Sequence, residues 1–301
     1  MINGILNIKK EPGFTSHDVV AKLRGIVKQK KIGHTGTLDP DATGVLPVCL
    51  GRATRLCDVI GGWNKTYEAV LLLGKCTDTE DISGKTINES PVEITEEEIR
   101  DIILSFIGTY NQIPPMYSAK KVGGKKLYEM AREGIVIERK PCPVRIISIT
   151  IHEITLPEIR FSVTCSKGTY IRSLCRDIGE KAGCGGCMKS LIRTEVAGFS
   201  LSDALTLSDV EQFRDEGRLM EIIHPIDSVF MDYPAITLFG TAEKLLHNGN
   251  PIRLDTIKKA VIPENARIIR VYDSGSHFIG LYQVDKEEGR IRPYKLFFDI
   301  T

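Results

Sequence analysis

The chain has 301 residues, of which 42% are hydrophobic and 26% are charged. This is the composition of an ordinary globular protein, and it excludes a collagen, a coiled coil or a wholly disordered chain. With 40 basic and 39 acidic residues the formal net charge is +1, which over the whole chain argues against a nucleic-acid partner.

The balanced total hides charged blocks of opposite sign. Residues 76–101 hold nine acidic and two basic residues, a net of −7, whereas residues 9–31 hold seven basic and two acidic residues, a net of +5. Residues 118–145, with eight basic against three acidic, and residues 160–193, with seven against two, are also at +5 each. Clustered Lys and Arg side chains are the expected electrostatic footprint of a polyphosphate ligand.

The residues 1–55 predict a strand, a helix and a long loop. Residues 4–8 are typical of a short strand, and Ser16 is a candidate cap for the helix that follows. One face of that helix is apolar and should be buried: Val19, Val20, Leu23, Ile26 and Val27. Glycines and prolines interrupt every periodicity in residues 30–55, so we expect a long ordered loop there, which is usually functional or mobile.

The middle of the chain mixes strands and helices. Residues 66–73 predict a buried strand, and a capping box from Thr95 to Glu98 predicts a helix. Residues 111–145 have the composition of a loop with many lysines. Two half-buried strands are indicated by alternation at Ile147, Ile149 and Ile151, and at Ile159, Phe161, Val163 and Cys165. A further helix is predicted to begin near residue 169 or 170 and to bury Ile171, Leu174, Cys175 and Ile178.

A domain boundary is predicted where the pattern loosens, between residues 223 and 234. The residues after it carry short strands, enough for a small β-rich module, so the chain predicts an α+β domain of catalytic size with a C-terminal appendage. No run of about 18 apolar residues is present, and the first residues lack the layout of a secretory signal. The eight cysteines therefore indicate reduced thiols of a cytoplasmic protein, and Cys184 and Cys187 form no recognisable metal or redox motif.

The segment 33–44, GHTGTLDPDATG, is the strongest candidate site. It offers two carboxylates, one imidazole and three hydroxyls on a glycine-punctuated scaffold. It is not a P-loop, because no Gly-Lys-Ser/Thr follows the first glycine, and one imidazole does not build a transition-metal cage. One carboxylate can serve as a nucleophile or a base, but a plain turn rich in Asp explains these residues equally well at this point.

The stretch 33–55, GHTGTLDPDATGVLPVCLGRATR, resembles the signature of the TruB family of tRNA pseudouridine synthases, in which a GHxGxLDPxAxGxLP run carries the catalytic aspartate. Other stretches resemble the family as well: Lys10 to Ser16, Lys65 to Ala69, Gln112 to Ala119, Ser166 to Leu174 and Leu191 to Phe199. The resemblance covers about residues 1–225, and the tail is similar to the small PUA module of bacterial members. Cys187 and Ile192 stand where the family commonly has His and Arg.

The resemblance implies an α+β pseudouridine-synthase core, with a mixed, mainly antiparallel sheet and flanking helices, over residues 1–230, and a PUA-like domain over residues 235–301. It also implies isomerisation of uridine 55 in the T loop of tRNA, in which the glycosidic bond breaks, the base turns and C5 is joined to the ribose. The T stem-loop would be recognised chiefly by its shape. The enzyme would act as a monomer, with neither cofactor nor metal.

The catalytic residues carried over by the resemblance are Asp39, Tyr67 and Arg172. Arg172 would hold the Asp39 carboxylate ionised and aimed, and Tyr67 would stack on the target base. A carboxylate can add to the ribose or the base, or remove a ribose proton, and the sequence leaves these three routes open. Because the nucleotide must leave its stack, His34 is expected to fill the vacated space as an exposed imidazole of the loop.

The resemblance implies several further substrate-binding residues: Lys10, Tyr170, Leu191, Lys120, Lys121, Lys125 and Lys126. Lys10 would support the pocket, and the other four lysines would contact phosphates in a stretch that orders on RNA, so that affinity falls with salt. Two other functions stay open from the sequence. One is an RNA-binding or RNA-folding module with incidental catalysis, and the other is a metal-dependent hydrolase built on Asp39, Asp41 and His34.

Overall fold

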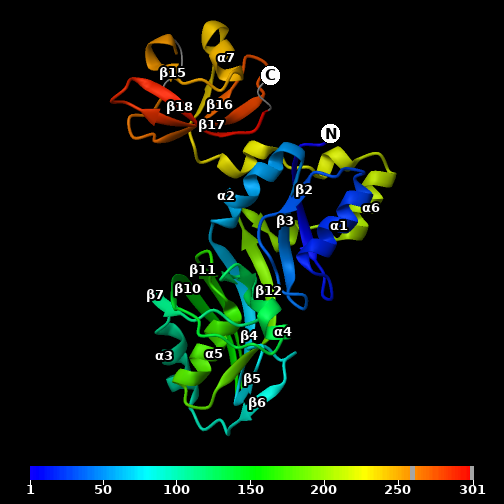
Figure 1. The fold of residues 1–301 in the computed structure, drawn as a ribbon, viewed down its shortest axis with the longest axis vertical. Helices are drawn as coiled ribbons and strands as arrows, with labels where there is room; N and C mark the ends of the chain where they lie inside the picture. Colours follow the sequence, from blue (N-terminus) through cyan, green and yellow to red (C-terminus); the bar gives the residue numbers. More distant parts are fainter. Residues whose placement is uncertain (258–261, 299–301) are drawn as a thin grey trace.

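The computed structural model describes residues 1–257 and 262–298. Its larger sheet runs through the long axis of the main body (Figure 1). In spatial order the strands are β1 (Gly4–Lys10), β3 (Thr43–Leu50), β12 (Gly186–Val196), β4 (Lys65–Leu73), β11 (Glu158–Cys165), β10 (Cys142–Thr155) and β7 (Gly108–Gln112), with β2 (Ile32–His34) beside β3 and β13 (Phe199–Ser200) beside β12. All neighbours are antiparallel except β12 and β3, so the expected α+β fold with a mixed, mainly antiparallel sheet is confirmed.

Helices cover this sheet in two groups. The helices α3 (Glu96–Leu104) and α5 (Ile171–Lys181) pack on a buried cluster that includes Leu71, Phe161 and Leu174. At the other end, α1 (Ser16–Ile26) and α6 (Leu207–Asp215) cover a second cluster around Leu23 and Leu46 (Figure 1). The shorter elements are α2 (Cys57–Gly61), α4 (Leu127–Arg132) and the 3-10 turns Gly51–Leu56, Leu201–Asp203, Leu219–Ile222, Ile226–Phe230 and Leu254–Thr256.

The predicted helix starts are right to within one residue. The capping box from Thr95 to Glu98 is present at α3, and α5 begins at Ile171 after Tyr170. The cap of α1, however, is Thr15 rather than Ser16, because the Thr15 hydroxyl accepts the N–H of Asp18. Ser16 has a different task, which is described with the site.

The prediction of one long loop over residues 30–55 is wrong. Residues 32–34 form β2, residues 43–50 form β3, and residues 51–56 form a 3-10 turn, so the loop shrinks to residues 35–42. Pro47 lies inside β3, opposite Asn7 of β1. A proline removes one N–H from a strand but leaves its carbonyl, and Pro47 uses that carbonyl to accept the N–H of Thr35 at 3.2 Å.

Residues 111–145 are also more ordered than their composition predicts. They include a hairpin of β8 (Lys121–Val122) and β9 (Lys125–Lys126), followed by α4. Gly123 and Gly124 form its turn with φ of 59° and 87°, the left-handed conformation that a two-residue hairpin loop requires. In β10 the expected alternation shifts at a bulge, so that Ile146 is buried and Ile147 is exposed.

The C-terminal module, residues 235–298, forms a second sheet above the main body in Figure 1. Its strands, in spatial order, are β14 (Ala235–Thr237), β16 (Ile268–Tyr272), β17 (Phe278–Asp285), β18 (Arg290–Leu296) and β15 (Ile252–Arg253), and they share a core with α7 (Gly240–His247). A small separate pair is formed by β5 (Lys75–Thr77) and β6 (Thr86–Glu89). Over the described residues, no helix has the length and apolar character needed to cross a membrane.

The module packs against the main body through aromatic side chains. Phe230 lies 6.1 Å from Trp63, 6.3 Å from Phe278 and 6.1 Å from Phe297, measured between ring centroids. Arg55 donates to the carbonyls at the end of β18 and beyond it, Leu296 and Phe298. These contacts place the module on the side of the sheet that carries α2.

Candidate active site

The carboxylate of Asp39 and the guanidinium of Arg172 form a two-pronged ion pair. Arg172 Nε lies 2.9 Å from Asp39 Oδ2, and Arg172 Nη2 donates to Oδ1 at 3.0 Å. Paired contacts of this kind fix both the position and the plane of a carboxylate. The Arg172 side chain is 5% exposed and that of Asp39 is 38% exposed, so the acid faces solvent from a buried cationic support.

The loop that carries Asp39 is fixed to helix α1. The Ser16 hydroxyl, at the first position of that helix, accepts the N–H of Leu38 at 2.9 Å. Within the loop the carbonyl of Asp39 accepts the N–H of Ala42 at 3.1 Å, which closes a turn. Both bonds act on backbone next to the carboxylate, so the turn explanation and the catalytic explanation of this segment are compatible.

Lys10, at the end of β1, supports the same loop from below the surface. Its side chain is fully buried, and its ammonium donates to the carbonyls of Pro40 at 2.8 Å and Ala42 at 2.6 Å. Burial lowers the pKa of Lys10 to about 8, although the negative charges of Asp41 and Asp39 act in the opposite direction. The structure thus places Lys10 under the loop that carries Asp39.

The far end of the loop is pinned to β12 by a close backbone approach. Gly44 pairs with Arg193 where β3 and β12 run parallel. The φ of Gly44 is 105°, and a Cβ there would lie 2.2 Å from the Arg193 carbonyl oxygen. Only glycine fits this position, which brings the two halves of the sheet together beside the Asp39 loop.

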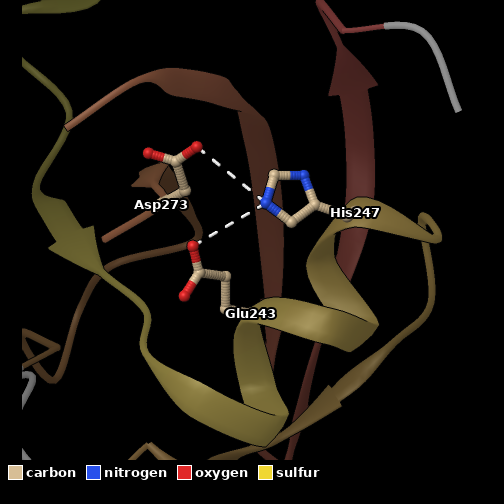
Figure 2. Close-up of side chains that lie close together, drawn as sticks. All are labelled: Glu243, His247 and Asp273. Atoms are coloured by element: carbon tan, nitrogen blue, oxygen red, sulfur yellow. Dashed lines mark ion pairs between the residues drawn. The ribbon is translucent and has the colours of Figure 1, made fainter. Parts of the chain in front are cut away.

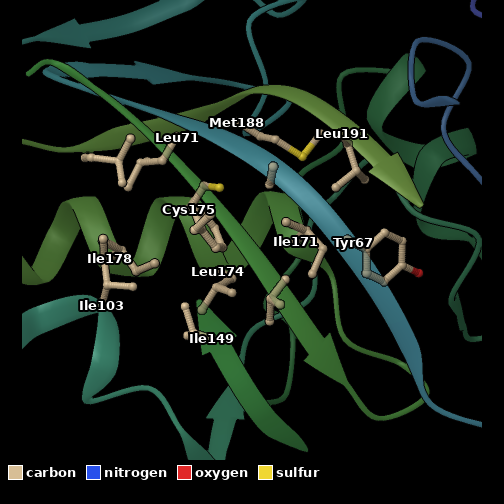
Figure 3. Close-up of a cluster of buried hydrophobic side chains, with 14 of the residues drawn as sticks. Tyr67, Leu71, Ile103, Ile149, Ile171, Leu174, Cys175, Ile178, Met188 and Leu191 are labelled. Atoms are coloured by element: carbon tan, nitrogen blue, oxygen red, sulfur yellow. The ribbon is translucent and has the colours of Figure 1, made fainter. Parts of the chain in front are cut away.

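Tyr67, on β4, lies at the edge of the cluster shown in Figure 3, with its hydroxyl pointing away from the other labelled side chains. It is 8% exposed. Burial raises the pKa of Tyr67, while a hydrogen bond to Arg193 acts in the opposite direction. The structure therefore places Tyr67 at the edge of the core, where its ring presents little surface to solvent.

Arg193 is a site residue that the sequence analysis missed. It is 1% exposed, and it donates from Nε to the carbonyl of Val45 at 2.6 Å and from Nη2 to that of Gly36 at 3.2 Å. Burial lowers the pKa of Arg193, and its contact with Tyr67 acts in the opposite direction. Its position two residues after Leu191, in a stretch that resembles the family, was the one signal in the sequence.

Arg172 is itself held by backbone oxygens. Its Nη1 donates to the carbonyl of Thr79 at 3.1 Å and its Nη2 to that of Tyr117 at 2.9 Å, and its Nε lies 3.8 Å from Asp81 Oδ2. Thr79 and Asp81 belong to the acidic block, and Tyr117 belongs to the segment 112–119. Two stretches far apart in the sequence thus fix the cation that fixes Asp39.

Glu80 anchors the acidic block to α5 from inside the protein. Its carboxylate accepts the Ser173 hydroxyl at 2.6 Å, forms an ion pair with Arg176, and lies 3.9 Å from Arg139. The side chain is 9% exposed. The net charge of residues 76–101 gave no sign that Glu80 would turn inward next to Arg172.

His34 is not the exposed loop residue that the sequence predicts. It lies on β2, is partly buried, and packs edge-on against His17 with 5.2 Å between ring centroids. Burial lowers the pKa of His34 to about 4, and the nearby charges of His17 and Arg193 act in the same direction. The imidazole is therefore neutral near pH 7, and its Nδ1 is buried without a hydrogen-bond partner among the described residues.

Tyr170 and Leu191 lie next to the proposed catalytic residues. Tyr170 caps α5 just before Arg172, and its N–H and carbonyl both bond to the side-chain amide of Gln112. Leu191, on β12, lies opposite Ala69 of β4 and packs in the cluster that contains Tyr67 (Figure 3).

The four expected phosphate-contacting lysines behave differently. Lys121 and Lys125 are exposed on the β8–β9 hairpin. Lys126 lies over the ring of Tyr128, 5.3 Å from its centroid, and the amine of Lys120 lies 2.6 Å from the Cys142 thiol. The first two are the most exposed to a polyanion, although Lys125 Nζ also lies 4.0 Å from Glu133 Oε2.

The residues considered for a metal-dependent hydrolase do not gather into a cluster of ligands. Over residues 1–257 and 262–298, the one group of three possible ligands is Glu243, His247 and Asp273, which excludes Asp39, Asp41 and His34. Cys184 and Cys187 are free and buried, and burial raises the pKa of the Cys187 thiol to about 11.

Comparison with solved structures shows which proteins share this fold. A chain of a Cbf5–Nop10–Gar1 complex superimposes with a TM-score of 0.74 and 26% identity over 98% of this chain and 85% of that chain. A chain of an H/ACA ribonucleoprotein bound to a substrate RNA containing 2′-deoxyuridine gives a TM-score of 0.73 at 24% identity over the same shares, and this second likeness is one of fold.

Sequence comparison identifies the family. Residues 24–171 match the N-terminal domain of TruB family pseudouridylate synthase, and residues 172–231 match the tRNA pseudouridylate synthase B C-terminal domain. The chain is similar to tRNA pseudouridine synthase B of Lachnoclostridium phytofermentans, with 50% identity over 98% of this chain and 100% of that one. It is also similar to that of Clostridium kluyveri, with 45% identity over 93% of this chain and 95% of the other. The chain belongs to the TruB family of pseudouridylate synthases.

Proposed function

We propose that this chain converts uridine to pseudouridine at position 55 in the T loop of tRNA. Membership of the TruB family supports the isomerase reaction and a tRNA substrate. The observation in this chain that carries the proposal is the ion pair of Asp39 and Arg172. The carboxylate of Asp39, which lies in the family motif, is accessible and contacts the buried guanidinium of Arg172 through both of its oxygens.

The reaction needs no co-reactant. The bond between ribose C1′ and uracil N1 breaks, a bond forms between C1′ and C5 of the same base, C5 loses a proton, and N1 gains one. Asp39 acts by bonding to the ribose or the base, or by taking a ribose proton, and each route requires a carboxylate with an accessible oxygen. Arg172 stabilises its negative form through charge-assisted hydrogen bonds, and neither cofactor nor metal takes part.

The side chains around Tyr67 suit a flat, neutral base. The ring edge of Tyr67 and the side chain of Leu191 offer apolar contact to uracil, and Arg193 holds the Tyr67 hydroxyl. Extrusion of the nucleotide costs a few kcal/mol of stacking. The exposed lysines of the β8–β9 hairpin offset this cost by contacting phosphates, and the neutral ring of His34 stacks in the vacated space.

The domain assignment belongs to the same proposal. We place the catalytic domain at residues 1–230 and a PUA-like RNA-binding domain at residues 235–301. The separate sheet and separate core of residues 235–298 support this division. We expect a monomer in the cytoplasm, where tRNA is present and the free thiols stay reduced.

The test is a map of the modified nucleotide. A tRNA transcript is incubated with the purified chain, and pseudouridine is located by carbodiimide treatment and primer extension. We expect one stop at position 55, the same stop in an isolated T stem-loop, and none when position 55 is cytidine. Modification at another uridine, or at none, would overturn the proposal.

A further inference from the structure

Three side chains with metal-binding atoms gather in the C-terminal module, and a fourth, His277, lies beside one of them. Glu243 and His247 are one turn apart on α7, and Asp273 and His277 flank the turn between β16 and β17. His247 Nε2 lies 3.8 Å from Glu243 Oε1 and 3.9 Å from Asp273 Oδ2, and it points between the two carboxylates (Figure 2). His277 Nδ1 lies 3.1 Å from the same oxygen of Asp273.

The donor atoms are oriented by bonds outside the group. Glu243 Oε1 accepts the hydroxyl of Ser274 at 2.8 Å, and Asp273 Oδ1 accepts the N–H of His277 at 2.8 Å. The His247 ring stands edge-on to Phe298, at 6.0 Å between ring centroids. Orientation of ligands by such secondary contacts is characteristic of metal sites.

The electrostatics of the group favour a cation. In the described chain the ion-pair partners of both carboxylates are histidines. An imidazole is an incomplete counter-charge because it must be protonated to be positive. Asp273 has a side chain only 10% exposed, so its charge is poorly screened by water.

We propose that Glu243, His247 and Asp273 bind one divalent transition-metal ion of the zinc class, with solvent as the fourth ligand. Tetrahedral zinc, with bonds of about 2.1 Å, places its ligand atoms about 3.4 Å apart, so the separations of 3.8 and 3.9 Å between His247 Nε2 and the two carboxylates need to close by about half an ångström. The imidazole of His247 favours zinc or a related ion over magnesium and calcium, which prefer oxygen ligands. The ion would join α7 to the β16–β17 turn and stabilise the module.

The test uses the full chain, free of any affinity tag and stripped with EDTA, titrated with Co²⁺ as the probe. The visible spectrum of bound Co²⁺ separates nitrogen and oxygen ligands from thiolates, which matters because the chain has eight cysteines. The variants are Glu243→Gln and Asp273→Asn, which keep an acceptor for Ser274 and His277, together with His247→Asn. The control is His152→Asn, an exposed histidine of β10 bonded to Ser162.

We expect one Co²⁺ per chain without thiolate bands, displaced by Zn²⁺, and affinity at least about tenfold weaker in each variant but unchanged in the control. Circular dichroism and thermal unfolding of each stripped variant verify that it is folded. Absence of binding, thiolate bands, or binding that persists in Glu243→Gln and Asp273→Asn would overturn the proposal. Isomerisation of tRNA by the stripped protein is a separate readout, so failure here leaves the proposed function intact.

Discussion

Arg172 and Asp39 form one ion pair but differ sharply in how far each side chain is exposed to solvent. Arg172 is buried and also donates to two backbone carbonyls, whereas Asp39 keeps 38% of its side chain exposed. The cation is therefore part of the folded framework and the anion is its accessible end. A substrate that reaches the pair meets a carboxylate whose orientation was fixed before binding, which is the arrangement that lowers the reorganisation needed for catalysis.

The two-pronged contact of Arg172 with the Asp39 carboxylate should matter more to kcat than the positive charge alone. Arg172→Lys keeps the charge but cannot contact both carboxylate oxygens, so we expect kcat to fall by about 100-fold while KM for tRNA changes little. Arg160→Lys, at an exposed arginine of β11, is the control. Steady-state kinetics on a tRNA transcript measure both, and a kcat for Arg172→Lys near that of the wild type would refute the positioning role.

Lys10 should produce an alkaline limb in the activity profile. Its ammonium donates to three carbonyls, those of Glu11, Pro40 and Ala42, and the neutral amine has one hydrogen too few to do so. With a pKa of about 8, support of the loop weakens above that pH, and we expect kcat to decline there. The variant Lys10→Met should be slower and lack this limb.

The free energy of unfolding should rise with pH between about 8 and 10.5, the range in which kcat is expected to fall. The pKa of Lys10 is lower in the folded chain, about 8, than its ordinary value of 10.5, so the unfolded chain binds more protons between these values. Lys10 therefore makes folding more favourable as pH rises through this window and adds no pH dependence below it.

Lys65 is the control for the alkaline limb in kcat, because burial also lowers its pKa to about 8. The variant Lys65→Met should retain that limb.

Gly44 should tolerate no side chain. Alanine there combines a left-handed φ with a Cβ that overlaps the Arg193 carbonyl, so Gly44→Ala should lower the free energy of unfolding by about 3 kcal/mol or more. Gly25→Ala, in α1 with open space around its Cβ, should be neutral or stabilise by up to about 1 kcal/mol. Urea unfolding distinguishes them, and equal stabilities would contradict the account of this strand contact.

The β8–β9 hairpin should contribute binding but not chemistry. Replacing Lys121 and Lys125 by alanine removes two exposed charges, so we expect KM for tRNA to rise by about tenfold, kcat to stay unchanged, and the slope of log affinity against log salt to decrease by about 2. Lys85→Ala, in the acidic block, should change none of these. An unchanged salt slope in the double variant would rule out phosphate contacts by the hairpin.

Local patterns predicted the elements whose stability is local. The capping box of Thr95 and Glu98 and the alternation of β11 are confirmed because each depends on neighbours a few residues away. The buried strand β3 was missed because a proline usually interrupts a strand. Pro47 is nevertheless accommodated inside β3, where its carbonyl accepts the N–H of Thr35. The bulge in β10 shifted the buried position to Ile146 for a reason that lies in the pairing with β11.

The candidate site shows the same division. Asp39 and Arg172, 133 positions apart, were paired through a family resemblance, since no spacing rule connects them. Arg193 and Glu80 were missed because their roles depend on long-range contacts with Tyr67 and α5, which composition and periodicity do not encode. The half-burial of His34 likewise follows from its pairing on β2 and its contact with His17.

The most direct test of the central claim is release of tritium from a tRNA transcript labelled at C5 of uridine. We predict one tritium per transcript from the wild-type chain, none when position 55 is cytidine, and none from Asp39→Asn, which keeps the size of the side chain but not its charge. Release by Asp39→Asn at the wild-type rate would contradict the assignment of the chemistry to this carboxylate.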